Sequence, residues 1–325
     1  MIDLVALRSL KAIDVHGSVV GAAEALGYSP SAISQQIKRL DKHFGLPSLE
    51  KFGRGIMLTE HGRRLAEQGA SLLAQVELLE AGVQAEGGKP SGAVRISAHS
   101  TACRGLLAPM LAELEAADSA VTVTFVENDP WVSIDLVATG QVDLAVVHNW
   151  NTQPLRIPAH IQTLDLCVDV ADVLLHRSHR LASRSEVTPR DLVDERWVST
   201  TTGSICHDWL IRMFADIGAD PHIPFYDSEF ATHLALVEQG VAVGLLPRLG
   251  RPLLPESVVA VRVVDPVPTR NIQLIWRRTM SQSPAIRHLA AVLQTIANPG
   301  LLRASLQSHP AGDVTAASAT GRPAG

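Results

Sequence analysis

The chain has 325 residues and a formal net charge of −5, with 46% hydrophobic and 19% charged residues. This length suits about two domains at ~150 residues each, and the composition is typical of a folded chain rather than a disordered or fibrous one. No apolar run reaches the roughly 18 residues that a membrane span needs, and the start, Met1, Ile2 and Asp3, lacks a basic signal-peptide flank. We therefore expect a cytoplasmic protein with no membrane partner.

The charge is unevenly distributed along the chain. Residues 1–64 carry nine Lys or Arg and six Asp or Glu, a balance of +3, whereas residues 65–325 have a balance of −8. Only a DNA-binding module must neutralise phosphates, so a basic head on an acidic body suits such a module joined to a domain with another role.

The first 28 residues predict two helices. Asp3 can cap the first helix, whose apolar stripe contains Leu4, Leu7, Leu10 and Ile13, and Gly17 ends it. Ser18 can cap a short second helix over 19–26. A tight turn then leads to Ser29 and Pro30, an N-cap and a first-turn proline.

A third helix over 30–44 has two chemically different faces. Its apolar face, formed by Ile33, Ile37, Leu40 and Phe44, is expected to pack on the first two helices. The opposite face carries Ser31, Ser34, Gln35, Lys38 and Lys42. Short hydrogen-bonding groups followed by cations suit a helix that meets base edges first and phosphates later, although a solvated face has the same polarity.

Residues 17–26 (GSVVGAAEAL) and 29–37 (SPSAISQQI) resemble the head of LysR-type transcriptional regulators. Residues 52–55 (FGRG) and 58–62 (LTEHG) are similar to that family's wing and linker entry. Ser48, Leu49 and Lys51 depart from the usual Leu-Phe pair and Arg. The resemblance implies a winged helix-turn-helix, and the DNA contacts that we predict are Ser29, Ser31, Ser34, Gln35, Lys38 and Arg54.

A long helix from the Thr59 cap to about Glu86 is predicted next. Its small and apolar residues follow 4-3-4 spacing, which indicates a heptad seam between two copies of the chain: Leu65, Gly69, Leu72, Val76, Leu79 and Val83. Two heads on one dimer axis predict a palindromic operator on double-stranded DNA. The resemblance implies a homodimer or homotetramer. The glycine-rich residues 87–92 predict a hinge.

From residue 93 the pattern changes to alternating strands and helices. Strands are expected near 94–98, 121–125, 142–147, 167–170, 197–199, 223–226, 241–247 and 271–276, and helices near 105–117, 131–139, 205–217 and 285–297. This is an α/β domain of two subdomains. Residues 140–145 (GQVDLA) and 238–247 (EQGVAVGLLP) are similar to the family's effector domain, which implies a bilobed fold like that of periplasmic binding proteins.

The predicted fold class is therefore an α/β multidomain protein. We expect a winged helix-turn-helix at 1–59, a dimerisation helix at 60–88 and an effector-binding domain at 91–298. Within the last, subdomain 1 would take 91–165 and 267–298, and subdomain 2 would take 166–266. The tail 299–325, rich in Ala, Ser, Gly and Pro, is expected to be disordered.

Polar side chains follow several of the predicted strands. Ligands of open α/β sheets bind at the carboxyl ends of strands, so these residues are candidate effector contacts. They are His99, Ser100, Thr101, Asn128, His148, Thr200 and Thr201, and the resemblance adds Phe230 and Thr232. Hydroxyls and imidazoles beside a helix start predict a small polar or anionic effector. Each residue taken singly could equally cap a helix or bond a loop.

Three other classes of protein compete with this interpretation. Residues 27–31 (GYSPS) lack the last glycine of a hydrolase nucleophile motif. A solute-binding protein would leave residues 1–88 without a role. A thiol redox sensor is the alternative regulator, since Cys206 would lie near the cleft, but Cys167 is thirty-nine positions away and Cys103 is farther.

We expect no catalytic residue, cofactor or metal site. His176 and His179 form an H-x-x-H pair without the carboxylate of a zinc motif, and the three cysteines are expected to be reduced and buried. The predicted mechanism is that effector closure of the subdomains changes head spacing and DNA bending, with RNA polymerase as a further partner.

Overall fold

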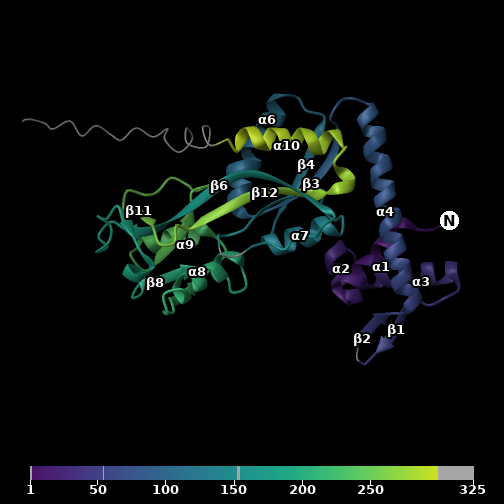
Figure 1. The fold of residues 1–325 in the computed structure, drawn as a ribbon, viewed down its shortest axis with the longest axis horizontal. Coiled ribbons are helices and arrows are strands. Elements are labelled where there is room, and N and C mark those ends of the chain that lie inside the picture. The colour runs from purple at the N-terminus through teal and green to yellow at the C-terminus, as the bar shows by residue number, and fades with distance from the viewer. Residues whose placement is uncertain (1, 54, 152–153, 299–325) are drawn as a thin grey trace, which may run out of the picture.

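The computed structural model describes residues 2–53, 55–151 and 154–298. Three parts follow one another along the chain: an N-terminal head, a long helix along one side of the molecule, and a large C-terminal domain (Figure 1). Arg54 and the tail 299–325, on which two sequence predictions fall, lie outside the described residues. None of the helices in the described ranges is both long and apolar enough to cross a membrane.

The three helices of the head begin and end where the capping residues predict. They are α1 (Leu4–His16), α2 (Val19–Leu26) and α3 (Pro30–Phe44). Side-chain oxygens of Asp3, Ser18 and Ser29 accept N–H groups of the first turns of α1, α2 and α3 respectively. The buried core joins the predicted stripes, with Leu7, Leu10, Ile13, Ala22, Ala23, Ile33, Ile37 and Leu40 at its centre.

The wing is a two-stranded hairpin of β1 (Leu49–Phe52) and β2 (Gly55–Leu58). Ser48, where the sequence departs from the family pattern, is fully buried beneath it. Asp41 accepts the Ser48 N–H at 2.9 Å, and the Ser48 carbonyl accepts the Thr59 N–H at 3.0 Å. The backbone of Ser48 therefore joins α3 to the start of the next helix.

The long helix α4 (Glu60–Glu86) starts after the Thr59 cap, as predicted. The predicted seam is divided between two environments. Leu65 and Gly69 are buried against the chain's own head, where Leu7 lies against Gly69. Leu79 and Val83 are 68% and 60% exposed, so the unpartnered part of the seam lies in the second half of α4.

One ten-stranded sheet runs through the C-terminal domain, in the order β4-β3-β5-β12-β6-β10-β8-β9. Off this order, β11 pairs with β6, and β7 pairs with β11. The strands are β3 (Gly92–Ala98), β4 (Val121–Glu127), β5 (Leu144–His148), β6 (Ile161–His176), β7 (Glu186–Val187), β8 (Arg196–Ser199), β9 (His222–Tyr226), β10 (Val243–Pro247), β11 (Val258–Val263) and β12 (Thr269–Arg277). β3, β4 and β5 are parallel in subdomain 1, as are β8, β9 and β10 in subdomain 2.

Helices cover both faces of the sheet in each subdomain. In subdomain 1, α6 (Ala108–Ala116) and α10 (Pro284–Ile296) lie on one face and α7 (Pro130–Ala138) on the other (Figure 1). Subdomain 2 carries α8 (Ile205–Ala215) and α9 (Phe230–Glu238). Short helical turns at Pro189–Leu192 (η2) and Arg278–Met280 (η3) complete the described set.

The sequence placed one helix start too late and one strand start too late. The helix expected from 105 begins at Ser100 as α5 (Ser100–Ala102) and continues through a π turn (Cys103–Leu107) into α6. β6 begins at Ile161, not near 167, and runs for 16 residues. Its first half pairs with β12 and its second half with β10 and β11, so β6 belongs to both subdomains. β7 and β11 were not anticipated.

Gly62 gives a test of the junction between wing and linker helix. A Cβ atom at this position would lie 2.1 Å from the Ser48 carbonyl oxygen, a backbone atom that cannot rotate away. We expect Gly62→Ala to lower the free energy of unfolding of the head by about 2 kcal/mol through this overlap. Urea unfolding of the full chain measures the effect.

Gly82→Ala is the matched control on the same helix. A Cβ there meets nothing within 4 Å, so the better helix propensity of Ala should raise stability by about 0.5–1 kcal/mol. Equal effects of the two substitutions would contradict the close approach at Ser48.

Candidate functional site

The outer face of α3 carries the predicted DNA contacts. Ser31, Gln35 and Lys38 are exposed, and no contact is described between Gln35 or Lys38 and another side chain of residues 2–53. Ser29 caps α3, and the Ser34 hydroxyl donates to the Pro30 carbonyl at 2.8 Å. The two serines thus already serve the helix, whereas Gln35 and Lys38 are available to a partner.

A cavity of about 620 Å³ lies where the two subdomains meet. Eight of the nine predicted effector contacts line it: His99, Ser100, Thr101, Asn128, His148, Thr200, Thr201 and Phe230. Thr232 does not line it and is half-buried on α9. Successive side chains of an α-helix are rotated by about 100° around its axis, so Thr232 is about 200° from Phe230. Thr232 therefore points away from the cavity that Phe230 faces. The cavity also contains residues that sequence reasoning missed, chiefly Arg270, Asp129, Arg104 and Ser204.

Arg270 forms the floor of this cavity and is only 1% exposed. Its Nε donates to Asp169 at 2.9 Å, and its Nη2 donates to the Thr101 hydroxyl at 2.7 Å. Its guanidinium also lies over the Trp150 ring, 5.6 Å from the ring centroid. Because β12 runs antiparallel to β5, its first residues lie at the carboxyl ends of the parallel strands. The sequence prediction considered only residues that follow strands, so it missed Arg270, which lies near the start of a strand.

Two buried histidines stand above the floor. The rings of His99 and His148 meet edge to face, with centroids 4.4 Å apart. Burial lowers the pKa of both well below the usual histidine value, and the charge of Arg270 lowers each further. Both rings are therefore neutral at physiological pH. His99 Nε2 and His148 Nδ1 are buried with no hydrogen-bond partner among the described residues.

Internal bonds hold the polar walls in place. On the subdomain 2 side, the hydroxyls of Thr200 and Ser204 are 2.7 Å apart. On the subdomain 1 side, Asn128 Nδ2 donates to the buried Ser97 hydroxyl at 3.2 Å. These bonds fix the rotamers of the wall residues, so the cavity is largely preformed.

One acidic residue of the cavity, Asp129, has a raised pKa. Burial raises the pKa of Asp129 to about 6, and the nearby charge of Asp208 raises it further. A hydrogen bond from the backbone N–H of Ile205 acts in the opposite direction. Asp129 precedes α7 in subdomain 1 and Ile205 begins α8 in subdomain 2, so this carboxyl spans the cleft. Its negative charge is poorly compensated by its surroundings.

The cysteines are not arranged as a reactive pair. All three are free thiols, and burial raises the pKa of Cys206, Cys167 and Cys103 to about 11. At neutral pH roughly one thiol in 10⁴ would then be a thiolate, the reactive species. Cys206 does line the cavity, as expected, and burial favours the protonated form of its thiol.

Both histidines of the H-x-x-H pair contact other side chains of the protein. His176 Nδ1 contacts the Ser178 hydroxyl at 2.7 Å, and His179 pairs with Glu195 at 3.0 Å. No cluster of three or more metal-ligating side chains occurs in the part of the chain that the structure describes. A second cavity, of about 610 Å³, lies between the head and subdomain 1, but the buried histidines are not part of it.

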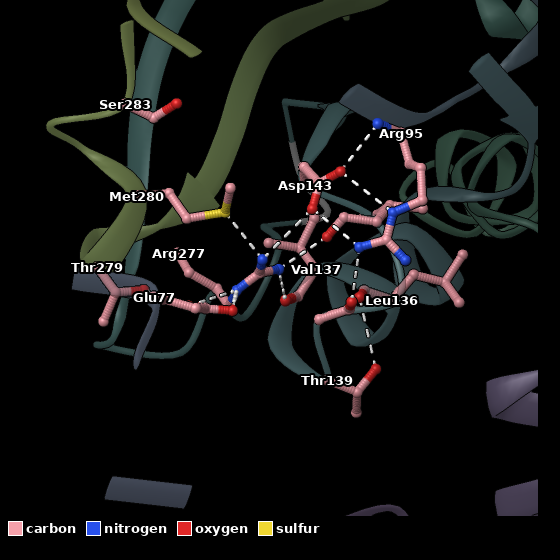
Figure 2. A network of polar contacts seen from close by, with 12 residues as sticks. Glu77, Arg95, Leu136, Val137, Thr139, Asp143, Arg277, Thr279, Met280 and Ser283 are labelled. Carbon is pink, nitrogen blue, oxygen red and sulfur yellow. Dashed lines mark hydrogen bonds and ion pairs between the residues drawn. The ribbon is translucent and has the colours of Figure 1, made fainter. Parts of the chain in front are cut away.

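A polar network joins subdomain 1 to the linker helix (Figure 2). Arg277, at the end of β12, contacts both carboxylate oxygens of Glu77 on α4 through its Nε, at 2.9 and 3.1 Å. Its Nη1 donates to the carbonyls of Val137 and Val142, and Thr279 donates to Glu77. Asp143, 3.6 Å from Arg277, is held by Arg95. Glu77 is thus attached to the C-terminal domain by two residues.

The N-terminal head and the C-terminal domain each match a known protein family. Residues 4–63 match the family "Bacterial regulatory helix-turn-helix protein, lysR family", and residues 87–297 match the "LysR substrate binding domain". The small neutral protease regulatory protein of Streptomyces coelicolor is 28% identical over 293 residues, which cover 88% of this chain and 90% of that protein.

Two further relatives cover most of the chain. The hydrogen peroxide-inducible genes activator of Dickeya chrysanthemi is 24% identical, over 83% of this chain and 88% of that protein. Full-length OxyR from Pseudomonas aeruginosa has the same fold, with a TM-score of 0.64 and 20% identity over 90% of this chain and 98% of that one. The helix-turn-helix head, the linker helix and the bilobed domain occur in one chain in the order of this family. The protein belongs to the LysR family of DNA-binding transcriptional regulators, with an effector-binding domain at its C-terminal end.

Proposed function

We propose that α3 and the wing read an operator, that the cleft cavity binds a small polar effector, and that β12 carries the signal between them. The observation that carries this proposal is the position of two arginines on one strand. Arg270 lies near the start of β12 at the cavity floor, and Arg277 ends the strand at the linker helix. The strand between them spans roughly 23 Å at about 3.3 Å per residue.

An effector can act on this strand in two ways. It can compete for the Thr101 hydroxyl, which now accepts from Arg270, or it can draw Thr200 and Phe230 toward subdomain 1. Either event favours a different position of β12 relative to α4. Since Arg277 and Thr279 hold Glu77, a shift of β12 changes the angle at which α4 presents the head.

The second half of α4 supports a paired arrangement. Leu72, Leu79 and Val83 form an exposed apolar stripe, which a second copy of the chain would cover in a homodimer. A further pairing would give a homotetramer, a palindromic operator and altered access for RNA polymerase. We place this regulator in the cytoplasm, where the DNA lies, and assign it no catalytic role.

Two substitutions on α3 should distinguish the reading of bases from the binding of phosphates. Gln35→Ala should reduce the preference for the operator over random DNA by about tenfold, because an amide can distinguish base edges. Lys38→Ala should weaken binding to all sequences and reduce the salt dependence by about one unit of slope, as loss of one phosphate contact does. Fluorescence anisotropy at several salt concentrations measures both.

Arg262→Ala, on the exposed face of β11 in subdomain 2, is the control and should leave both quantities unchanged. Equal loss of specificity from Gln35→Ala and Lys38→Ala would contradict the assignment of α3 as the reading helix.

Asp129 predicts a pH dependence of stability. The folded state favours the neutral carboxyl, so ionisation costs folding free energy as pH rises from the ordinary value of 3.8 to about 6. Asp129→Asn should therefore stabilise the protein at pH 8 by about 1 kcal/mol, a figure reduced for partial exposure, and by much less at pH 4.

Unfolding of both proteins at the two pH values measures this difference. Asp135→Asn, on the exposed side of the same helix, should show no such dependence. An equal effect of Asp129→Asn at both pH values would refute a raised pKa for the Asp129 carboxyl.

Glu77 tests the connection to the linker helix. Glu77→Gln removes the charge that Arg277 contacts, while Arg277 itself stays largely buried. We expect a loss of about 1–2 kcal/mol and faster amide exchange in the middle of α4. Hydrogen exchange read by mass spectrometry shows the site, and the exposed Glu80→Gln on the same helix is the control. Unchanged exchange in Glu77→Gln would remove the contact from the coupling route.

A further inference from the structure

The cation at the floor of the cavity is already neutralised. Arg270 is paired with Asp169, whose other carboxylate oxygen accepts the N–H groups of Val170 and Leu249 at 2.9 and 3.0 Å. Its Nη2 also donates to the Thr101 hydroxyl. The Asp169 charge offsets that of Arg270, which weakens the attraction of the floor for an anionic ligand.

Two buried histidine nitrogens beside this floor have no partner among the described residues, and one of them, His99 Nε2, is a hydrogen-bond acceptor. His99 Nδ1 lies 3.3 Å from the Val146 carbonyl, which can only accept, so Nδ1 carries the proton of the neutral ring. His99 Nε2 therefore offers a lone pair. The residue is only 7% exposed, and no described group donates to this nitrogen. A ligand that supplies an N–H donor would satisfy an atom that the fold leaves without a bond.

The rim adds negative charge. Three carboxylates line the cavity, Glu127, Asp129 and Glu229, and no ion pair of theirs occurs among the described residues. The opposing cation is Arg104, which is exposed and donates to the Gly250 carbonyl at 2.9 Å. With the Arg270–Asp169 pair neutral, the acids of the cavity outnumber its cations. The potential beside the three rim carboxylates therefore favours a cation.

We propose that the effector is a small organic cation, an amine whose charge lies beside Asp129 and Glu127 and which also places an N–H donor on His99 Nε2. This inference rests on the proposed function, since it names the ligand class of the same cavity. It differs from the polar or anionic effector expected from the sequence, because the buried cation of the cavity, Arg270, is already paired with Asp169. A cavity of about 620 Å³ has room for such a molecule and for polar groups that reach Thr200 and Thr201.

Ligands of equal shape and different charge test the proposal. Thermal unfolding of the full chain at pH 7.5 would be followed with benzylamine, benzyl alcohol and benzoate, and with 1,4-diaminobutane, 1,4-butanediol and succinate. We expect an amine in at least one series to raise the melting temperature in a saturable way at millimolar concentration. The matching carboxylate should have no effect. Stabilisation by the carboxylate instead of the amine, or by neither amine, would overturn the proposal.

Substitutions locate the binding. Glu127→Gln and Asp129→Asn should each weaken the stabilising amine about tenfold in calorimetry, the effect of losing one partly desolvated charge contact. Glu113→Gln, exposed on α6 and not part of the cavity, is the matched control and should bind as the parent does. Amine binding that the two cavity variants do not alter would contradict the site.

The same amine separates this inference from the proposed function. If it binds in the cavity and changes operator affinity, both stand. If it binds there with the expected variant effects and operator affinity is unchanged, the ligand class stands and the proposed coupling fails.

Discussion

The C-terminal domain depends on one buried ion pair, Asp169 with Arg270. The two residues are direct cross-strand partners where β6 and β12 pass from one subdomain to the other. Burying both charges is costly, and the further hydrogen bonds that the two groups make offset part of that cost. Asp169 also holds the backbone of Leu249, after β10, and Arg270 holds Thr101, after β3. One interaction therefore connects both subdomains and leaves the cavity floor without free charge.

The long strands explain how a binding site and a linker helix can communicate. A hydrogen-bonded strand transmits displacement along its length better than a loop does, because its backbone is held on both sides. β12 lies between β5 and β6 and ends at Arg277, where two backbone carbonyls and Glu77 fix the guanidinium. The head itself is attached through α1 packing on the first half of α4, so movement of α4 moves the head.

The head and the cavity have opposite electrostatic requirements. The head must attract phosphates. On α3, Arg39 pairs with Asp3, whereas the exposed Lys38 and Lys42 form no ion pair among the described residues. The cavity combines neutral histidines, a neutralised arginine and unpaired carboxylates. This contrast gives the basic N-terminal and acidic C-terminal balance of the sequence a physical meaning at each end of the linker helix.

Interactions between residues close in the sequence determine the helix starts and the apolar face of each helix in the head, so the sequence alone predicted them. Asp3, Ser18, Ser29 and Thr59 predicted the helix starts because a cap is a contact between near neighbours, and the apolar stripes predicted the head core. Polar residues after strands predicted seven of the residues lining the cavity, and the family resemblance added Phe230. Tertiary structure alone decided the rest. Arg270, Asp169 and Glu77 acquire their roles from partners about 100 to 200 positions away. Whether a cleft of hydroxyls and imidazoles suits an anion or a cation depends on which charges are already paired, and only the folded chain settles those pairings.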